Sequence, residues 1–114
     1  MTISEREKKL KMDAAKVIMF NNEKKKVGGY ELKSEPSNIG KIFKYMIYIR
    51  GKTFIDVAKK LGGCTPQNIN HLFNRTKREH FPEYIIKKLC IYLRIDENYF
   101  YRLLEEVDSV LGVK

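Results

Sequence analysis

Side chains that both donate and accept hydrogen bonds gather in one nine-residue stretch, residues 66–74. Amides and imidazoles of this kind can pair with the edges of nucleic-acid bases. An ordinary solvated helix face is the alternative, although such faces are usually built from Lys and Glu. The five side chains in question are Gln67, Asn68, Asn70, His71 and Asn74.

A short helix is predicted to carry these side chains. Thr65 offers a capping hydroxyl, and Pro66 suits the first helical position, so we expect the helix to begin there. Three apolar residues at helical spacing should form its buried face. These are Ile69, Leu72 and Phe73.

A second helix is predicted immediately before it. Thr53 and Asp56 have the spacing of a capping box, and Gly62-Gly63 supplies the left-handed backbone that ends a helix. Its apolar face consists of Phe54, Val57, Ala58 and Leu61. Two short helices joined by a tight turn form a DNA-binding motif in which the second helix enters the major groove.

On these residues the sequence resembles the phage-repressor and Cro-like helix-turn-helix proteins. It is most similar to small regulators of Gram-positive bacteria and their mobile elements, over roughly residues 39–104. Between Ala58 and Ile69 the chain has one residue more than the family usually has, which we place in Gly63-Cys64. The resemblance is carried by residues 58–62 and 65–74, by Arg75, Lys77 and Arg78, and by Phe81-Pro82.

The resemblance implies an all-α, lambda-repressor-like domain of five helices over residues 37–114. Residues 1–36 would add an N-terminal helix and a basic linker. The implied function is sequence-specific binding of double-stranded DNA by a transcriptional regulator, which we expect to be a repressor. The expected base contacts are Pro66, Gln67, Asn68, Asn70 and His71. The expected phosphate contacts are Lys41, Lys52, Thr65, Asn74, Arg75, Lys77 and Arg78.

Positive charge is concentrated on the segment that contains this motif. Residues 37–94 hold 12 basic and 3 acidic side chains, whereas residues 95–114 hold 2 basic and 5 acidic ones. A polyanion attracts such a basic segment through phosphate contacts and counterion release. A charge excess that only keeps the protein dissolved is the alternative.

The first 36 residues are predicted to form a helix and a linker. A capping box at Ser4 and Glu7 opens an amphipathic helix that we expect to end near Phe20. The linker, residues 21–36, contains a run of three lysines at 24–26. That run suits a solvated loop or a basic arm along DNA, and the short apolar stretches around it could instead pair as a hairpin.

Two segments lie outside what the five-helix domain requires, namely the N-terminal helix and the C-terminal tail. The tail continues an apolar stripe through Val107, Val110 and Leu111. Either segment could form a dimer surface or pack back on the core. We expect a homodimer, because one such domain contacts only one DNA half-site.

No sequence feature indicates an enzyme, a cofactor or a metal site. His71 and His80 have no acidic or thiol partner at ligand spacing, so we expect no zinc. Cys64 and Cys90 are consistent with free thiols in a reducing cytoplasm, and no signal peptide or membrane span is recognisable. Cys64 precedes a helix, where redox sensing is conceivable, but a small turn residue is the simpler interpretation.

Two other functions remain open from the sequence. A helix-turn-helix module can bind another protein, as an antirepressor, an antitoxin or an inhibitor in a mobile-element system would, and the N-terminal extension could carry this role. RNA binding would use the basic loop and the tyrosines. The exposed rings available for it would be Tyr45, Tyr48 and Tyr101.

Overall fold

The computed structural model describes residues 2–23, 26–27, 30–31 and 36–114. Six α-helices make up most of this part of the chain, which confirms the all-α prediction. A short 3-10 helix, Arg78–His80, follows the fourth of them. The α-helices are α1 (Ile3–Glu23), α2 (Asn38–Ile49), α3 (Phe54–Leu61), α4 (Pro66–Phe73), α5 (Glu83–Leu93) and α6 (Glu97–Leu111).

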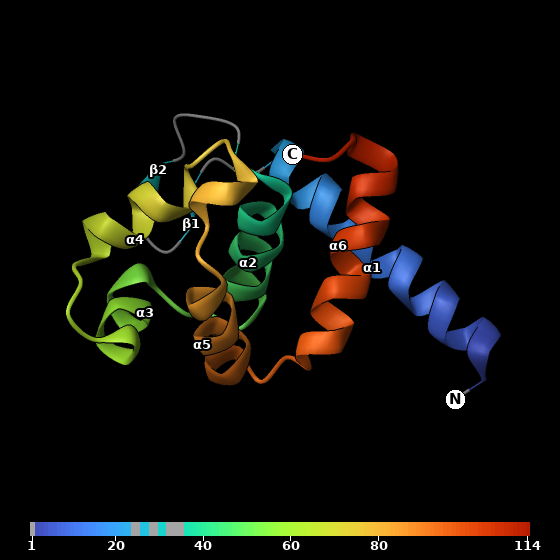
Figure 1. The fold of residues 1–114 in the computed structure, drawn as a ribbon, viewed down its shortest axis with the longest axis horizontal. Coiled ribbons are helices and arrows are strands. Elements are labelled where there is room, and N and C mark those ends of the chain that lie inside the picture. The colour runs from blue at the N-terminus through green and yellow to red at the C-terminus, as the bar shows by residue number, and fades with distance from the viewer. Residues whose placement is uncertain (1, 24–25, 28–29, 32–35) are drawn as a thin grey trace.

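Helix α2 lies at the centre of the molecule, with α3 and α4 at one end and α1 and α6 at the other (Figure 1). Its inner face is fully buried at Ile42, Phe43 and Ile47. The ring of Phe43 stacks on Phe100 at a centroid distance of 4.7 Å and on Phe81 at 5.7 Å. Stacked aromatic pairs of this kind add to the energy of burial, so α2 ties both ends to one core.

Helix α1 is part of that same core. It packs on α6 and α2 and buries the face formed by Leu10, Ala14, Val17 and Phe20. The helix continues to Glu23, three residues beyond the predicted end at Phe20. The predicted cap at Ser4 is wrong, because the Thr2 hydroxyl accepts the hydrogen bond, from the Glu5 amide at 3.2 Å.

A small antiparallel pair of strands follows α1. Strands β1 (Lys26–Val27) and β2 (Tyr30–Glu31) pair Lys26 with Glu31 and Val27 with Tyr30. A hairpin therefore exists, but it begins at the last lysine of the run instead of pairing the apolar stretches around that run. Lys24 and Lys25, two of the three lysines of the suggested basic arm, lie outside the described residues.

The C-terminal segment is tied back to the start of α2. The Asn38 side chain donates to Oδ1 of Asp108 at 2.7 Å and to the carbonyl of Gly112 at 2.8 Å. The backbone amide of Asn38 donates to the carbonyl of Lys114 at 3.1 Å. In the described part of the chain, no helix is long and apolar enough to cross a membrane.

Candidate nucleic-acid interface

Helix α3 begins and ends at the residues that the sequence predicts. The Asp56 amide donates to the Thr53 hydroxyl at 3.1 Å, and the Thr53 amide donates to Oδ2 of Asp56 at 2.9 Å, which completes the capping box. Hydrogen bonds from Thr53 lower the pKa of the Asp56 carboxyl. Gly62 and Gly63 have φ angles of +74° and +64°, a conformation that favours glycine. The turn between α3 and α4 therefore relies on two consecutive glycines.

Helix α4 also begins as predicted. The Thr65 hydroxyl accepts from the Asn68 amide at 3.2 Å, and Pro66 is the first helical residue. The inner face, Ile69, Leu72 and Phe73, is buried. Helices α3 and α4 pack together, with the rings of Phe54 and Phe73 edge to face at 5.4 Å. We call α3, the turn and α4 the helix pair.

The end of α4 is held against the start of α2. The Ser37 amide donates to the Arg75 carbonyl at 3.0 Å. A Cβ atom placed on Gly40 would lie 3.0 Å from the Phe73 carbonyl and 3.1 Å from Cβ of Pro36, so no larger residue fits there without a shift. Backbone contacts therefore fix the position of α4 in addition to its buried side chains.

The opposite side of α4 presents polar side chains to solvent. Gln67, Asn68 and His71 are exposed, and their side chains form no hydrogen bond with any other residue that the structure describes. Pro66 is half-buried at the start of the helix. We call Gln67, Asn68 and His71 the outer face of α4. Its donors and acceptors are all available to an external partner.

The remaining two predicted polar residues of α4 bond within the protein. Nδ2 of Asn74 donates to Oδ1 of Asn70 at 3.0 Å, and Nζ of Lys44 on α2 donates to Oδ1 of Asn74 at 3.0 Å. Lys44 is fully buried, and this burial lowers the pKa of its side chain to about 7. The Asn74 side chain thus has an internal role, in place of the phosphate contact predicted for it.

Lys44 is a residue that sequence reasoning missed. Nothing in the local sequence of α2 distinguishes Lys44, because a buried lysine and a solvated lysine are the same residue type. Only its distant partner Asn74, thirty residues away along the chain, explains its place.

Three of the predicted phosphate contacts are exposed cations beside the helix pair, namely Lys52, Arg75 and Lys77. The Arg75 guanidinium donates to the carbonyl of His80, which holds the loop after α4. Lys52 lies over the Tyr92 ring, with Nζ 5.9 Å from the centroid. Thr65 is exposed at the N-terminus of α4, where backbone amides favour an anion. These four positions are compatible with contacts to a phosphate backbone.

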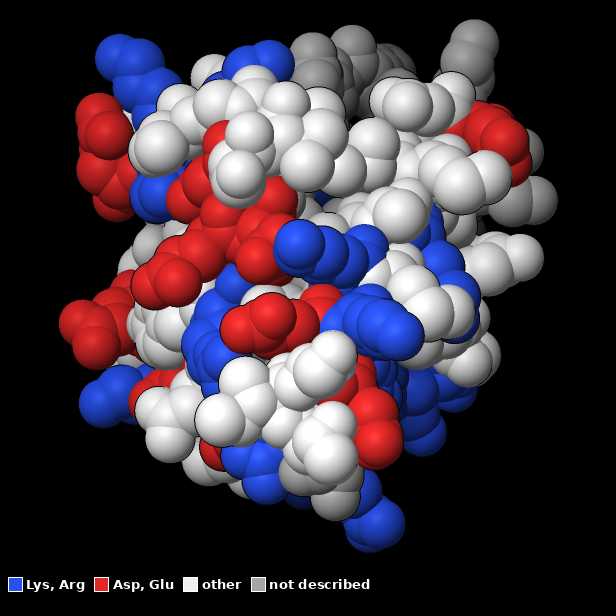
Figure 2. Space-filling model, turned by 90° about the vertical axis from the view of Figure 1, so that its right-hand side faces the viewer, with Lys and Arg blue, Asp and Glu red and all other residues white. Residues whose placement is uncertain are grey.

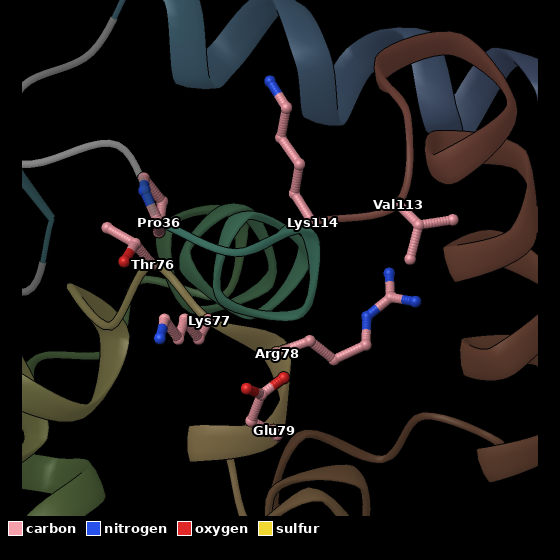
Figure 3. A pocket seen from close by; sticks show the side chains of 7 residues that line it. All are labelled: Pro36, Thr76, Lys77, Arg78, Glu79, Val113 and Lys114. Carbon is pink, nitrogen blue, oxygen red and sulfur yellow. The ribbon is translucent and has the colours of Figure 1, made fainter.

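Two other predicted phosphate contacts are placed differently. Lys41 is only 4% exposed, so its charge does not face solvent. Arg78 forms an ion pair with Asp108 of α6 and is half-buried. Figure 3 shows the Arg78 side chain extending from the loop toward the C-terminal segment, across a pocket of about 780 Å³. The burial of Lys41 and the ion pair of Arg78 both depend on distant parts of the chain. Residue type alone therefore could not predict them.

The face formed by α1 and α6 at the far end of the molecule has a different character. Figure 2 shows acidic and basic side chains lying next to one another on it. Nζ of Lys9 donates to Oδ2 of Asp13 at 3.0 Å, and the Tyr99 hydroxyl donates to the same carboxylate. Burial, the largest cause, and the bond to Asp13 raise the pKa of Tyr99 to about 12. Lys9, Asp13 and Tyr99 therefore satisfy one another within the protein.

The tyrosines proposed for RNA binding have packing roles. The ring of Phe20 contacts Tyr45 at 5.6 Å and Tyr48 at 4.8 Å, which fastens α1 to α2. Tyr101 lies edge to face with Phe100 at 5.3 Å. The three rings therefore do not form one open stacking platform.

Both cysteines are free thiols. Cys64 is half-buried and its thiol donates to the Ala58 carbonyl at 3.8 Å, while burial raises the pKa of Cys90 to about 11. Among the residues that the structure describes, no group of three His, Cys, Asp or Glu side chains could hold a metal ion.

Comparisons with known proteins found no match to this chain. No protein-family model matches the chain, and neither a curated protein nor a solved structure matches it.

Proposed function

We propose that the protein is a sequence-specific regulator that binds double-stranded DNA, with α4 in the major groove, and that it acts as a repressor. The observation that carries this proposal is the outer face of α4: three exposed polar side chains that bond to no other described side chain, on a helix whose position is fixed by the core. Gln and Asn side chains can bond to base edges in the major groove. A repressor-like arrangement of α2 to α6 is part of the same proposal.

The proposed backbone contacts are Lys52, Thr65, Arg75 and Lys77, which lie on both sides of α4 in the sequence. Contacts to phosphates fix the register of a protein on DNA without discriminating sequence. The loop after α4 is itself held by the Arg75 bond to His80, so its cations have a defined place. The outer face would then supply specificity and the flanking cations most of the affinity.

We also propose that the protein binds DNA as a homodimer. Exposed apolar side chains lie on the face opposite the helix pair, with Met12 and Met19 each 59% exposed and Val110 66% exposed. Met19 and Val110 line a groove of about 520 Å³ between α1 and α6. Exposed apolar side chains beside a groove suit a protein contact, and a second copy would double the DNA contact.

A selection from random duplex DNA at near-physiological salt, followed by sequencing, tests the function. We expect a short motif, present as an inverted repeat with half-sites about one helical turn apart. A protein with three alanines at Gln67, Asn68 and His71 is the control and should enrich no motif. If the unaltered protein enriches none either, the proposal is wrong, and the groove between α1 and α6 becomes the place to seek a protein partner.

A further inference from the structure

The chain of hydrogen bonds beneath α4 has a direction. Nζ of Lys44 carries only donors when it is protonated, so Asn74 must turn Oδ1 toward it. The Asn74 amide then has Nδ2 on its other side, where it donates to Oδ1 of Asn70. The two amide orientations, which are otherwise ambiguous, are therefore set by the buried lysine.

The end of this chain faces outward. Oδ1 of Asn70 is occupied by Asn74, which leaves Nδ2 as the second polar atom of the Asn70 amide. Nδ2 makes no hydrogen bond to any described residue, and it is not among the buried polar atoms that lack a partner. Asn70 is half-buried on the helix that carries the outer face. Its available group is therefore a donor.

We propose that Lys44 is a positioning residue for base recognition, which acts through Asn74 to hold the Asn70 amide with its NH₂ group toward the major groove. This inference rests on the proposed function. The chemistry of a donor selects base edges that present acceptors, namely O6 and N7 of guanine, N7 of adenine or O4 of thymine. It disfavours cytosine, whose major-groove group is itself a donor.

Three substitutions each interrupt this series of hydrogen bonds at a different residue. Lys44→Met removes the buried donor, and Asn74→Asp keeps the bond from Lys44 but can no longer donate to Asn70. Asn70→Asp keeps the bond from Asn74 but removes the outward donor. Lys41→Met is the matched control, because it removes a second buried lysine from the same helix, α2.

The experiment repeats the duplex selection with each variant and compares base preference position by position. We expect Asn70→Asp to lose the preference for an acceptor edge and to favour cytosine at one position of each half-site. Lys44→Met and Asn74→Asp should weaken the preference at that same position about tenfold, the loss expected for one hydrogen bond. Lys41→Met should keep the preference of the unaltered protein. If Lys44→Met and Asn74→Asp both keep it, the inference is wrong.

A measurement without DNA separates this inference from the proposed function. Side-chain amide resonances of Asn70 and Asn74 are recorded by ¹H–¹⁵N NMR in the free protein and in the Lys44→Met and Lys41→Met variants. We expect both amides to shift in Lys44→Met alone. Unchanged Asn70 resonances in Lys44→Met would contradict the inference even if DNA binding is confirmed. Shifted resonances with no selected DNA sequence would instead overturn the proposed function.

Discussion

The two ends of the molecule differ in whether their polar side chains form hydrogen bonds with one another. On the α1–α6 face, Lys9, Asp13 and Tyr99 bond to one another, and acidic and basic side chains lie next to one another on the surface (Figure 2). On the outer face of α4, Gln67 and His71 bond to no other described residue. Folding alone explains the first arrangement, because the groups satisfy each other. The second leaves hydrogen-bonding capacity for a partner.

Both ends depend on buried aromatic residues for their position. Phe20 fastens α1 to α2 through Tyr45 and Tyr48, and Phe73 fastens α4 to α3 through Phe54. The ends are therefore similarly anchored and differ mainly in what their surfaces present.

Removing an aromatic anchor should have the largest effect and separate the two ends. We expect Phe73→Ala to lower the free energy of unfolding by about 3–5 kcal/mol, because it leaves a cavity in a closely packed core. DNA affinity should fall with it. Phe20→Ala should also lower stability, but the folded variant should still bind a single half-site as the unaltered protein does, because Phe54 and Phe73 hold α4 at the other end. Urea unfolding measures the free energy of unfolding, and fluorescence anisotropy with duplex DNA measures affinity. If the folded forms of both variants lose the same affinity, the two ends do not differ in their role in DNA binding.

Substitution on the outer face should change binding without changing stability. Gln67→Ala is expected to cost about 1–3 kcal/mol of discrimination at one base pair. Asn98→Ala, an exposed residue at the start of α6, is the control and should leave affinity unchanged. Binding to a selected duplex and its single-base variants checks this. Unchanged discrimination in Gln67→Ala would exclude this side chain from base contact.

The buried Lys44 should make stability depend on pH. Its pKa is about 7 in the folded protein, and desolvation alone lowers it, whereas an unfolded lysine has a pKa near 10.5. Between these values the unfolded chain binds one proton more than the folded one, so the free energy of unfolding rises with pH. We expect a contribution of about 1–2 kcal/mol between pH 7 and pH 9.

Urea unfolding at a series of pH values measures that contribution. Lys44→Met should lose this rise, while Lys9→Met, at the exposed end of the molecule, should retain it. A rise of the same size in Lys44→Met would show that another group is responsible.

Exposed and paired cations after α4 should differ in their effect on salt dependence. Lys77→Ala should weaken binding to all sequences alike and reduce the slope of log affinity against log salt by about 1. The loss of affinity itself should be the smallest of these effects. Arg78→Ala should leave the slope unchanged and lower stability, because Arg78 is paired with Asp108. A reduced slope in Arg78→Ala would show that the ion pair opens on DNA.

Local features could be predicted from the sequence, and long-range ones could not. The caps at Thr53 and Thr65 and the glycine end of α3 depend on neighbours within four residues, so residue type was enough. The buried place of Lys44 and the pairing of Arg78 with Asp108 depend on partners thirty residues away. Residue type alone does not reveal such a distant partner, and for this reason the phosphate contacts predicted at Asn74 and Arg78 had to be revised.

The most direct test of the account is to map the DNA contact on the whole chain. ¹H–¹⁵N spectra are recorded while a selected duplex is added to the labelled protein. We predict that the largest shifts fall in Thr65–Asn74 and at Lys77, with little change on the solvent-facing side of α1 and α6 apart from the groove at Met19 and Val110. Shifts concentrated on the α1–α6 face, with α4 unchanged, would contradict the claim that the outer face of α4 contacts DNA.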